Sequence, residues 1–248
     1  MELTKHAVAR QRLPQMLSLI REAVKRRMEK TQCHIFFTAL FGSYRRGDYD
    51  AFSDIDLLII HEDESERLAI LDGLKGLEHM FGKRIHANLF EIREFERRVR
   101  LHDYLLTSMI RDSSLIYGSR EVFNKAEKEI EKQSSDEALK FNRQMGLETL
   151  DRALSFLNEG KMAGSSMEKM DWLIRGLNNY RLALGYLHAS DLMRRTREAI
   201  SYADLTKTAV GSTLKEIANM EGALKRGIKI DQRLLYRFIE RPKKICVI

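Results

Sequence analysis

The chain has 248 residues, of which 44% are hydrophobic and 32% charged, and its formal net charge is +7 at pH 7. This composition excludes an intrinsically disordered chain, and the positive charge favours polyanionic partners such as nucleotides or RNA. Two distant cysteines, Cys33 and Cys246, exclude a disulfide framework, and no apolar run could span a membrane, so we expect a cytoplasmic protein without a membrane anchor.

Residues 4–30 are expected to form the first helix. Leu17, Ile20, Val24 and Met28 recur at helical spacing, and arginine and lysine side chains occupy the other face. The helix therefore offers an apolar stripe on which the following strands can pack.

The stretch 36–60, FFTALFGSYRRGDYDAFSDIDLLII, consists of two apolar runs separated by a polar loop. Short apolar runs bounded by glycine and aspartate predict buried strands. Because side chains alternate along a strand, Asp54 and Asp56 share one face while Ile55 points to the other. Two adjacent carboxylates repel each other, and a divalent cation removes that cost. The alternative is a polar hairpin loop with two exposed acids. It does not explain why the two acids lie on the same face of a strand.

This stretch resembles the signature of the DNA polymerase β-like nucleotidyltransferase superfamily, in which a GS motif precedes a D-x-D pair. Here the motif is Gly42-Ser43, and the pair is Asp54 and Asp56. The resemblance implies a nucleoside triphosphate as substrate, with ATP expected, and Mg²⁺ or Mn²⁺ held by the two aspartates. The implied nucleotide-binding residues are Gly42, Ser43, Arg46 and Gly47. Arg45 is an alternative to Arg46 for offsetting charge on the leaving pyrophosphate.

A helix over 68–80 is expected next, ended by Gly82, and then a third strand over 84–90. In the superfamily a third carboxylate usually stands on this strand, and the resemblance places His86 there, as a candidate catalytic residue. Asn88 lies one step along, and Glu91 has the wrong parity unless the strand bulges. The alternative for His86 is a surface or hydrogen-bonded histidine without a catalytic part.

One or two short helices over 92–111 and a strand over 114–118 complete the expected first domain. Beyond it we expect an exposed helix and linker over 120–135, a helix starting near Ser134–Asp136 and stopped near Gly160, and one over 167–192. Further helices are expected at about 203–210, 212–225 and 231–240. The predicted fold class is α+β: a nucleotidyltransferase domain over 1–120, with a mixed sheet flanked by helices, followed by an all-α helical bundle over 121–248.

This arrangement resembles the aminoglycoside nucleotidyltransferases, and also minimal nucleotidyltransferases joined to a HEPN-type helical bundle. HEPN nucleases carry an arginine and a histidine a few residues apart on one helix, and Arg181 and His188 are similarly placed. Chance is the alternative explanation of that pair.

The predicted activity is Mg²⁺-dependent transfer of a nucleoside monophosphate to an acceptor hydroxyl on a small molecule, a protein or RNA. The alternatives are a nucleotide-binding or antitoxin-like module without turnover, and an RNA-directed HEPN-type protein. A homodimer is an open possibility for the assembly.

Overall fold

The computed structural model describes residues 18–228 and 230. The chain forms two compact units, and the boundary in the sequence lies between Gln133 and Ser134. The bounds expected from the sequence, 1–120 and 121–248, place the helix after residue 120 with the helical part. In the structure that helix, α6 (Arg120–Ile130), packs on the sheet of the first unit, through an edge-on contact between Phe123 and Phe37. The assignment of a separate function to each part stays a prediction.

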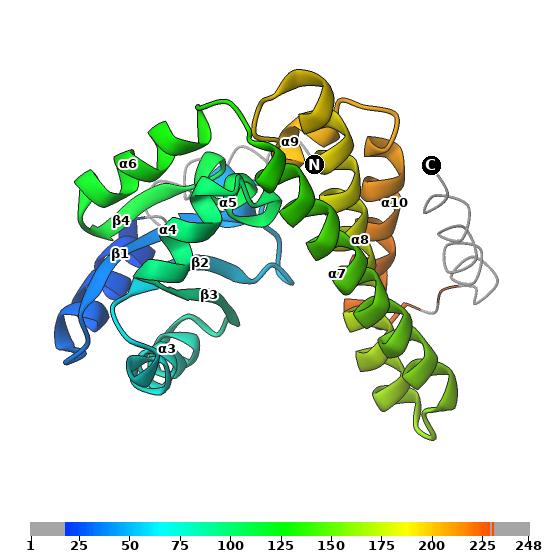
Figure 1. Ribbon diagram of the computed structural model, residues 1–248. Coiled ribbons are helices and arrows are strands. Elements are labelled where there is room, and N and C mark those ends of the chain that lie inside the picture. Colours follow the sequence, from blue (N-terminus) through cyan, green and yellow to red (C-terminus); the bar gives the residue numbers. More distant parts are fainter. Residues whose placement is uncertain (1–17, 229, 231–248) are drawn as a thin grey trace, which may run out of the picture. The chain divides into compact units, whose positions relative to one another are not determined.

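The first unit is built on a four-stranded sheet whose spatial order is β3-β2-β1-β4. Its strands are β1 (Ile35–Phe41), β2 (Ile55–His61), β3 (Ile85–Glu91) and β4 (Ser114–Gly118). β1 lies antiparallel to both β2 and β4, whereas β2 and β3 are parallel. The mixed sheet expected from the sequence is therefore confirmed, and Figure 1 shows helices on both of its faces.

The helices of the first unit follow the predicted order. Residues 18–30 are helical, and the further elements are α2 (Gly42–Arg46), the 3-10 turn η1 (Glu64–Glu66), α3 (Arg67–Phe81), α4 (Ile92–Arg100), α5 (Tyr104–Arg111) and α6. Gly82 ends α3 as predicted: it adopts a left-handed conformation (φ 59°), and its N–H donates to the carbonyl of Glu78. The apolar pattern did not predict the short helix α2 or the 3-10 turn η1.

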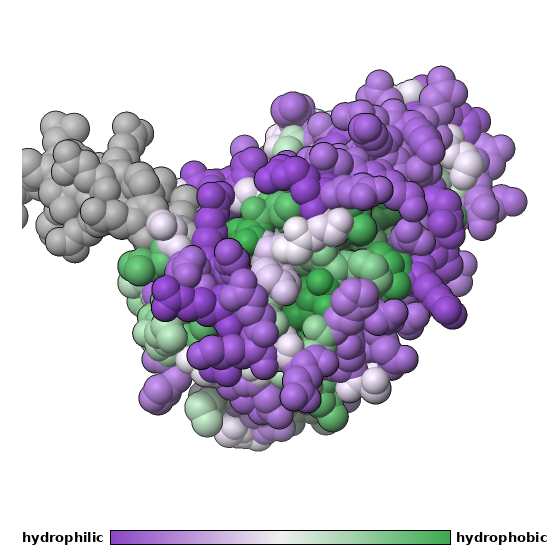
Figure 2. Space-filling model, turned by 90° about the vertical axis from the view of Figure 1, so that its left-hand side faces the viewer, coloured by the Kyte–Doolittle hydropathy of each residue, from purple (hydrophilic) through white to green (hydrophobic). Residues whose placement is uncertain are grey.

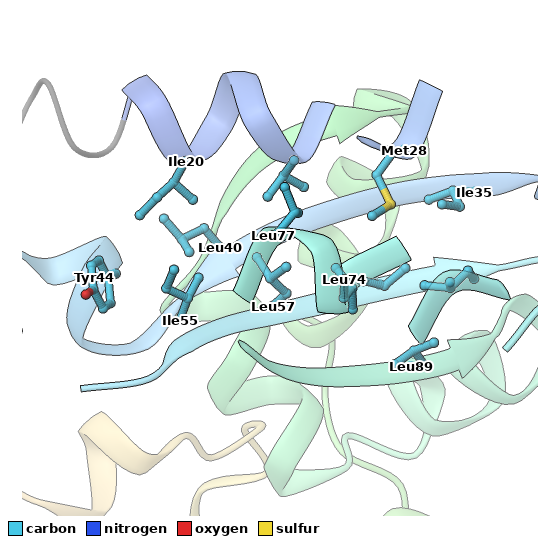
Figure 3. Close-up of a cluster of buried hydrophobic side chains, with 13 residues drawn as sticks. Ile20, Met28, Ile35, Leu40, Tyr44, Ile55, Leu57, Leu74, Leu77 and Leu89 are labelled. Atoms are coloured by element: carbon cyan, nitrogen blue, oxygen red, sulfur yellow. The ribbon is translucent and has the colours of Figure 1, made fainter. Parts of the chain in front are cut away.

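Alternation along the strands gives the sheet two apolar faces. On one face the helix over 18–30 and α3 cover the strands, and Figure 3 shows their side chains interleaved. The labelled members of this cluster are Ile20, Met28, Ile35, Leu40, Tyr44, Ile55, Leu57, Leu74, Leu77 and Leu89. On the other face Phe37 meets Phe95 of α4 and Phe123 of α6, with ring centroids 5.5 and 5.4 Å apart.

Hydrophobic side chains also reach the surface. Figure 2 shows them gathered in the middle of one face, within a border of hydrophilic side chains. Large exposed apolar side chains include Phe52, Leu68 and Met80. Among the described residues, no helix is both long and apolar enough to cross a bilayer.

The second unit is helical, as predicted, with α7 (Asp136–Met162), α8 (Ser166–Thr196), α9 (Tyr202–Leu205) and α10 (Gly211–Lys225). Ser135 starts α7 by accepting a hydrogen bond from the N–H of Ala138 at 3.1 Å, which confirms the predicted helix start. The helix α7 ends at Met162, near Gly160 as predicted, but Gly160 itself does not end it. A Cβ there would come within 3.3 Å of Leu173 and Trp172, so this glycine instead lets α7 and α8 approach closely.

The helix expected over 203–210 is shorter than predicted and ends at Leu205. The Thr206 and Thr208 hydroxyls donate to the carbonyls of Ala203 and Leu205, at 2.8 and 2.7 Å, and the following backbone forms tight turns. Hydroxyl side chains that bond to nearby carbonyls compete with helix continuation in this way. The helix predicted over 231–240, the start of the first helix with Leu17, and Cys246 lie outside the described residues.

Candidate active site

The GS motif, the D-x-D pair and His86 lie at one edge of the sheet of the first unit. Phe41, the last residue of β1, pairs with Asp56 near the start of β2, and Asp56 pairs in turn with His86 near the start of β3. On the other side of β1, Leu40 pairs with Ser114, the first residue of β4. The end of β1 and the beginnings of the three other strands therefore meet at this edge.

The chain turns after β1 through the short helix α2, with the sequence GSYRR. This segment, Gly42–Arg46, is called the GS turn below. Glycines bound it on both sides with left-handed backbone angles, φ 73° at Gly42 and 83° at Gly47, which other residues adopt only with strain. Tyr44 fixes the turn to the core: its side chain is 2% exposed, and its ring stacks on that of Tyr49 with centroids 4.3 Å apart. Figure 3 shows the Tyr44 ring beside Ile55 at the end of the buried cluster.

The two predicted motifs touch each other at Gly42. A Cβ added to Gly42 would lie 2.2 Å from Oδ2 of Asp56, so the carboxylate occupies space that only a glycine leaves open. Asp54 and Asp56 are half-buried, while the intervening Ile55 is 1% exposed. The predicted alternation is therefore confirmed, and it directs both carboxylates away from the core.

The side chain of Lys83 holds the loop before Asp54, through a contact that the sequence did not reveal. Nζ of Lys83 donates to the carbonyls of Asp50 and Ala51, at 3.2 and 2.5 Å. Within the loop, the Ser53 hydroxyl donates to the Asp50 carboxylate at 2.9 Å. The lysine comes from the segment that enters β3, so the loop is tied to the strand that carries His86.

His86 stands beside the carboxylates, as the family resemblance implied. Its Nδ1 lies 3.3 Å from Oδ1 of Asp56, and its side chain is 58% exposed. The β2–β3 register runs without a bulge as far as the pair His61 and Glu91. Glu91 is therefore at the far end of the strand, and Asn88 lies one alternation step beyond His86 on the same face, opposite Leu58.

Asp112, at the end of α5, is a site residue that sequence reasoning missed. Its Oδ2 accepts a hydrogen bond from the N–H of Gly42 at 3.2 Å and another from Nη1 of Arg46. Nη1 of Arg45 lies 3.6 Å from its other oxygen. Burial lowers the pKa of Arg46, but the Asp112 and Asp48 carboxylates outweigh that effect and raise it. A lone aspartate before a short strand gives no signal of such a role in the sequence.

The donor set fits a hard divalent cation that is shared with a substrate. Among the residues that the structure describes, no three histidine, cysteine or acidic side chains are grouped to hold a metal by themselves. Mg²⁺ is commonly held by one or two carboxylates together with substrate phosphates, which matches what Asp54 and Asp56 offer.

Arg181 and His188 lie on α8 in the second unit. Nη2 of Arg181 is 3.1 Å from Oδ1 of Asn178 and 3.5 Å from Oε2 of Glu221, which is 8% exposed. Burial lowers the pKa of His188, which favours its neutral form. The contact with Glu221 gives Arg181 a structural role in joining α8 to α10, and no finding supports the HEPN resemblance.

Comparisons with known proteins assign the first part of the chain. No match was found among curated proteins. Two toxin-antitoxin crystal structures show a partial likeness: one described as a complex with AMP-PNP (18% identity, 44% of this chain and 83% of that chain, TM-score 0.35), and one as a mutant of MntA-HpeT (15% identity, 42% and 80%, TM-score 0.32). Residues 17–139 match the family model described as the nucleotidyltransferase domain. This part of the chain therefore belongs to the nucleotidyltransferase domain family.

Proposed function

We propose that the protein transfers a nucleoside monophosphate from a nucleoside triphosphate, ATP in the first instance, to an acceptor hydroxyl. The observation that carries this proposal is the packing of Asp56 against Gly42, because it joins the GS turn and the D-x-D pair into one site. Membership of the nucleotidyltransferase domain family supports the reaction class.

Each residue has a defined part in this reaction. Asp54 and Asp56 would hold the divalent cation together with the triphosphate, and the cation, when bound, supplies charge neutralisation on the phosphates. Amides of the turn after Gly42 and the Ser43 hydroxyl offer donors to phosphate oxygens. The Arg46 guanidinium offsets charge on the leaving pyrophosphate.

The transfer is a displacement at the α-phosphorus of the triphosphate. The acceptor oxygen forms a bond to the α-phosphorus. The bond from that phosphorus to the oxygen that bridges the α- and β-phosphates breaks, and pyrophosphate leaves. The acceptor hydroxyl loses its proton. If Nδ1–H of His86 donates to Asp56, the other ring nitrogen carries a lone pair and can take that proton.

The test is pyrophosphate release from each of the four NTPs, with Mg²⁺ or Mn²⁺ and with small-molecule, protein and RNA acceptors. We expect Asp54→Asn and Asp56→Asn to lower the rate by at least about a hundredfold, as removal of transition-state charge stabilisation does elsewhere. Asp72→Asn is the matched control, since Asp72 is an exposed acid of the same unit that forms an ion pair with Lys75 at 2.6 Å. Turnover that Asp54→Asn leaves unchanged would contradict the proposal.

A second candidate function is nucleotide binding without turnover, and the specific observation that favours it is His86 beside Asp56 in place of a third carboxylate. It predicts metal-dependent ATP binding in calorimetry with no pyrophosphate release under any condition. Turnover by the wild type above the level of Asp54→Asn would exclude it.

A further inference from the structure

Asp112 and Asp56 flank the GS turn from opposite sides. β1 is the neighbour of both β2 and β4, and it is antiparallel to each. Asp56 lies near the start of β2, and Asp112 lies just before β4 begins at Ser114. The turn at the end of β1 is therefore placed between two carboxylates that come from distant parts of the chain.

The contacts of Asp112 converge on a single turn. The backbone N–H of Gly42 and the guanidinium of Arg46 both donate to Oδ2, and the Arg45 guanidinium is near Oδ1. The Asp112 side chain is 30% exposed, so these interactions are partly shielded from water. One carboxylate thus fixes both the first residue of the turn and the last side chain of α2.

Arg46 keeps donors for a further anion. Its Nε donates to Asp48 at 3.2 Å, and its Nη1 donates to Asp112. A guanidinium has five N–H donors in a rigid fork, so two contacts fix its plane and leave others for phosphate oxygens. A guanidinium held in this way loses less conformational freedom when an anion binds than an unrestrained arginine does.

We propose that Asp112 is a positioning residue, which holds Arg46 and the Gly42 turn in the orientation that receives the β- and γ-phosphates of the triphosphate. This inference rests on the proposed function, because that function assigns Arg46 to the leaving group. Asp112 itself touches no reacting atom and acts through Arg46.

The experiment is a double-mutant cycle on nucleotide binding, with the full chain and Mg²⁺. The probe is α,β-methylene-ATP, and the variants are Asp112→Asn, Arg46→Gln and the double variant. We expect each single change to weaken binding by about three- to tenfold, in line with loss of one hydrogen bond between charged groups at a partly exposed site. The double variant should bind within about twofold of Arg46→Gln, because the two residues act as one unit.

A second readout separates positioning from a general structural role. Binding of AMP, which lacks the β- and γ-phosphates, should change by less than about twofold in Asp112→Asn, whereas a disrupted fold weakens both ligands. Asp112→Glu keeps the charge and should recover part of the lost affinity. If Asp112→Asn does not fold, Asp112→Glu takes its place in the binding measurements.

Three results would overturn the inference: affinity unchanged in Asp112→Asn, additive losses in the cycle, or tighter binding in Asp112→Asn. The last would identify Asp112 as a competitor of the phosphates. These results are independent of turnover. If the wild type binds the analogue with the predicted coupling yet releases no pyrophosphate from ATP, the transfer proposal fails while the positioning role stands. If it does not bind the analogue at all, both fail.

Discussion

Substitution of Gly42 by alanine tests the central contact of the site. At φ 73° a Cβ adds strain of about 1–2 kcal/mol. In addition, the new Cβ would lie 2.2 Å from Oδ2 of Asp56, so the carboxylate has to retreat by roughly 1.3 Å to reach an ordinary van der Waals separation of about 3.5 Å. A displacement of that size at a catalytic group can lower the rate by about a hundredfold.

Gly82→Ala is a matched control for this change. Gly82 also has a left-handed backbone (φ 59°), but nothing lies within 4 Å of a Cβ built there. Gly82→Ala should lose about 1–2 kcal/mol in urea unfolding, and Gly42→Ala should lose at least as much, because the clash with Asp56 adds to the same backbone strain. Only Gly42→Ala should lose pyrophosphate release and metal-dependent nucleotide binding. Equal activity in the two variants would refute the reasoning, because it would mean that the position of Asp56 does not matter.

Two further predictions concern the candidate site, and a third concerns His102, which lies between α4 and α5. Tyr44→Ala should cost about 3–5 kcal/mol in urea unfolding, as large aromatic truncations in cores do, whereas Tyr44→Phe, which keeps the ring on Tyr49, should cost much less. His86→Asp should lower the melting temperature in EDTA, because two carboxylates then repel each other, and Mg²⁺ should restore it; a variant that responds to Mg²⁺ no more than the wild type would contradict this. Burial lowers the pKa of His102. Below the unfolded pKa of about 6.5, the unfolded chain therefore takes up a proton that the folded chain does not. The free energy of unfolding should decrease as the pH is lowered through this range. His102→Asn, which tolerates the left-handed φ of 47°, should flatten that part of the pH profile.

Local sequence preferences determined much of the secondary structure of this chain. The alternation of Asp54, Ile55 and Asp56 fixed which side chains leave the core, because the side-chain period of a strand needs no distant information. In the same way Gly82 and Ser135 marked helix ends through their own backbone and side-chain preferences. The order of strands and helices followed from these local patterns.

Only the tertiary structure decided which residues meet. The β2–β3 register set His86 opposite Asp56, and register depends on pairing between strands that are far apart in the sequence. Asp112 is 70 positions from Gly42, yet it accepts that residue's N–H, and no sequence pattern specifies a contact between a loop after a helix and a turn after a strand. Gly42 itself was predicted from its motif, but its physical necessity comes from the Asp56 carboxylate that fills the place of a side chain. The sequence thus determined the elements and their chemistry, while long-range strand pairing decided how those groups combine into a site.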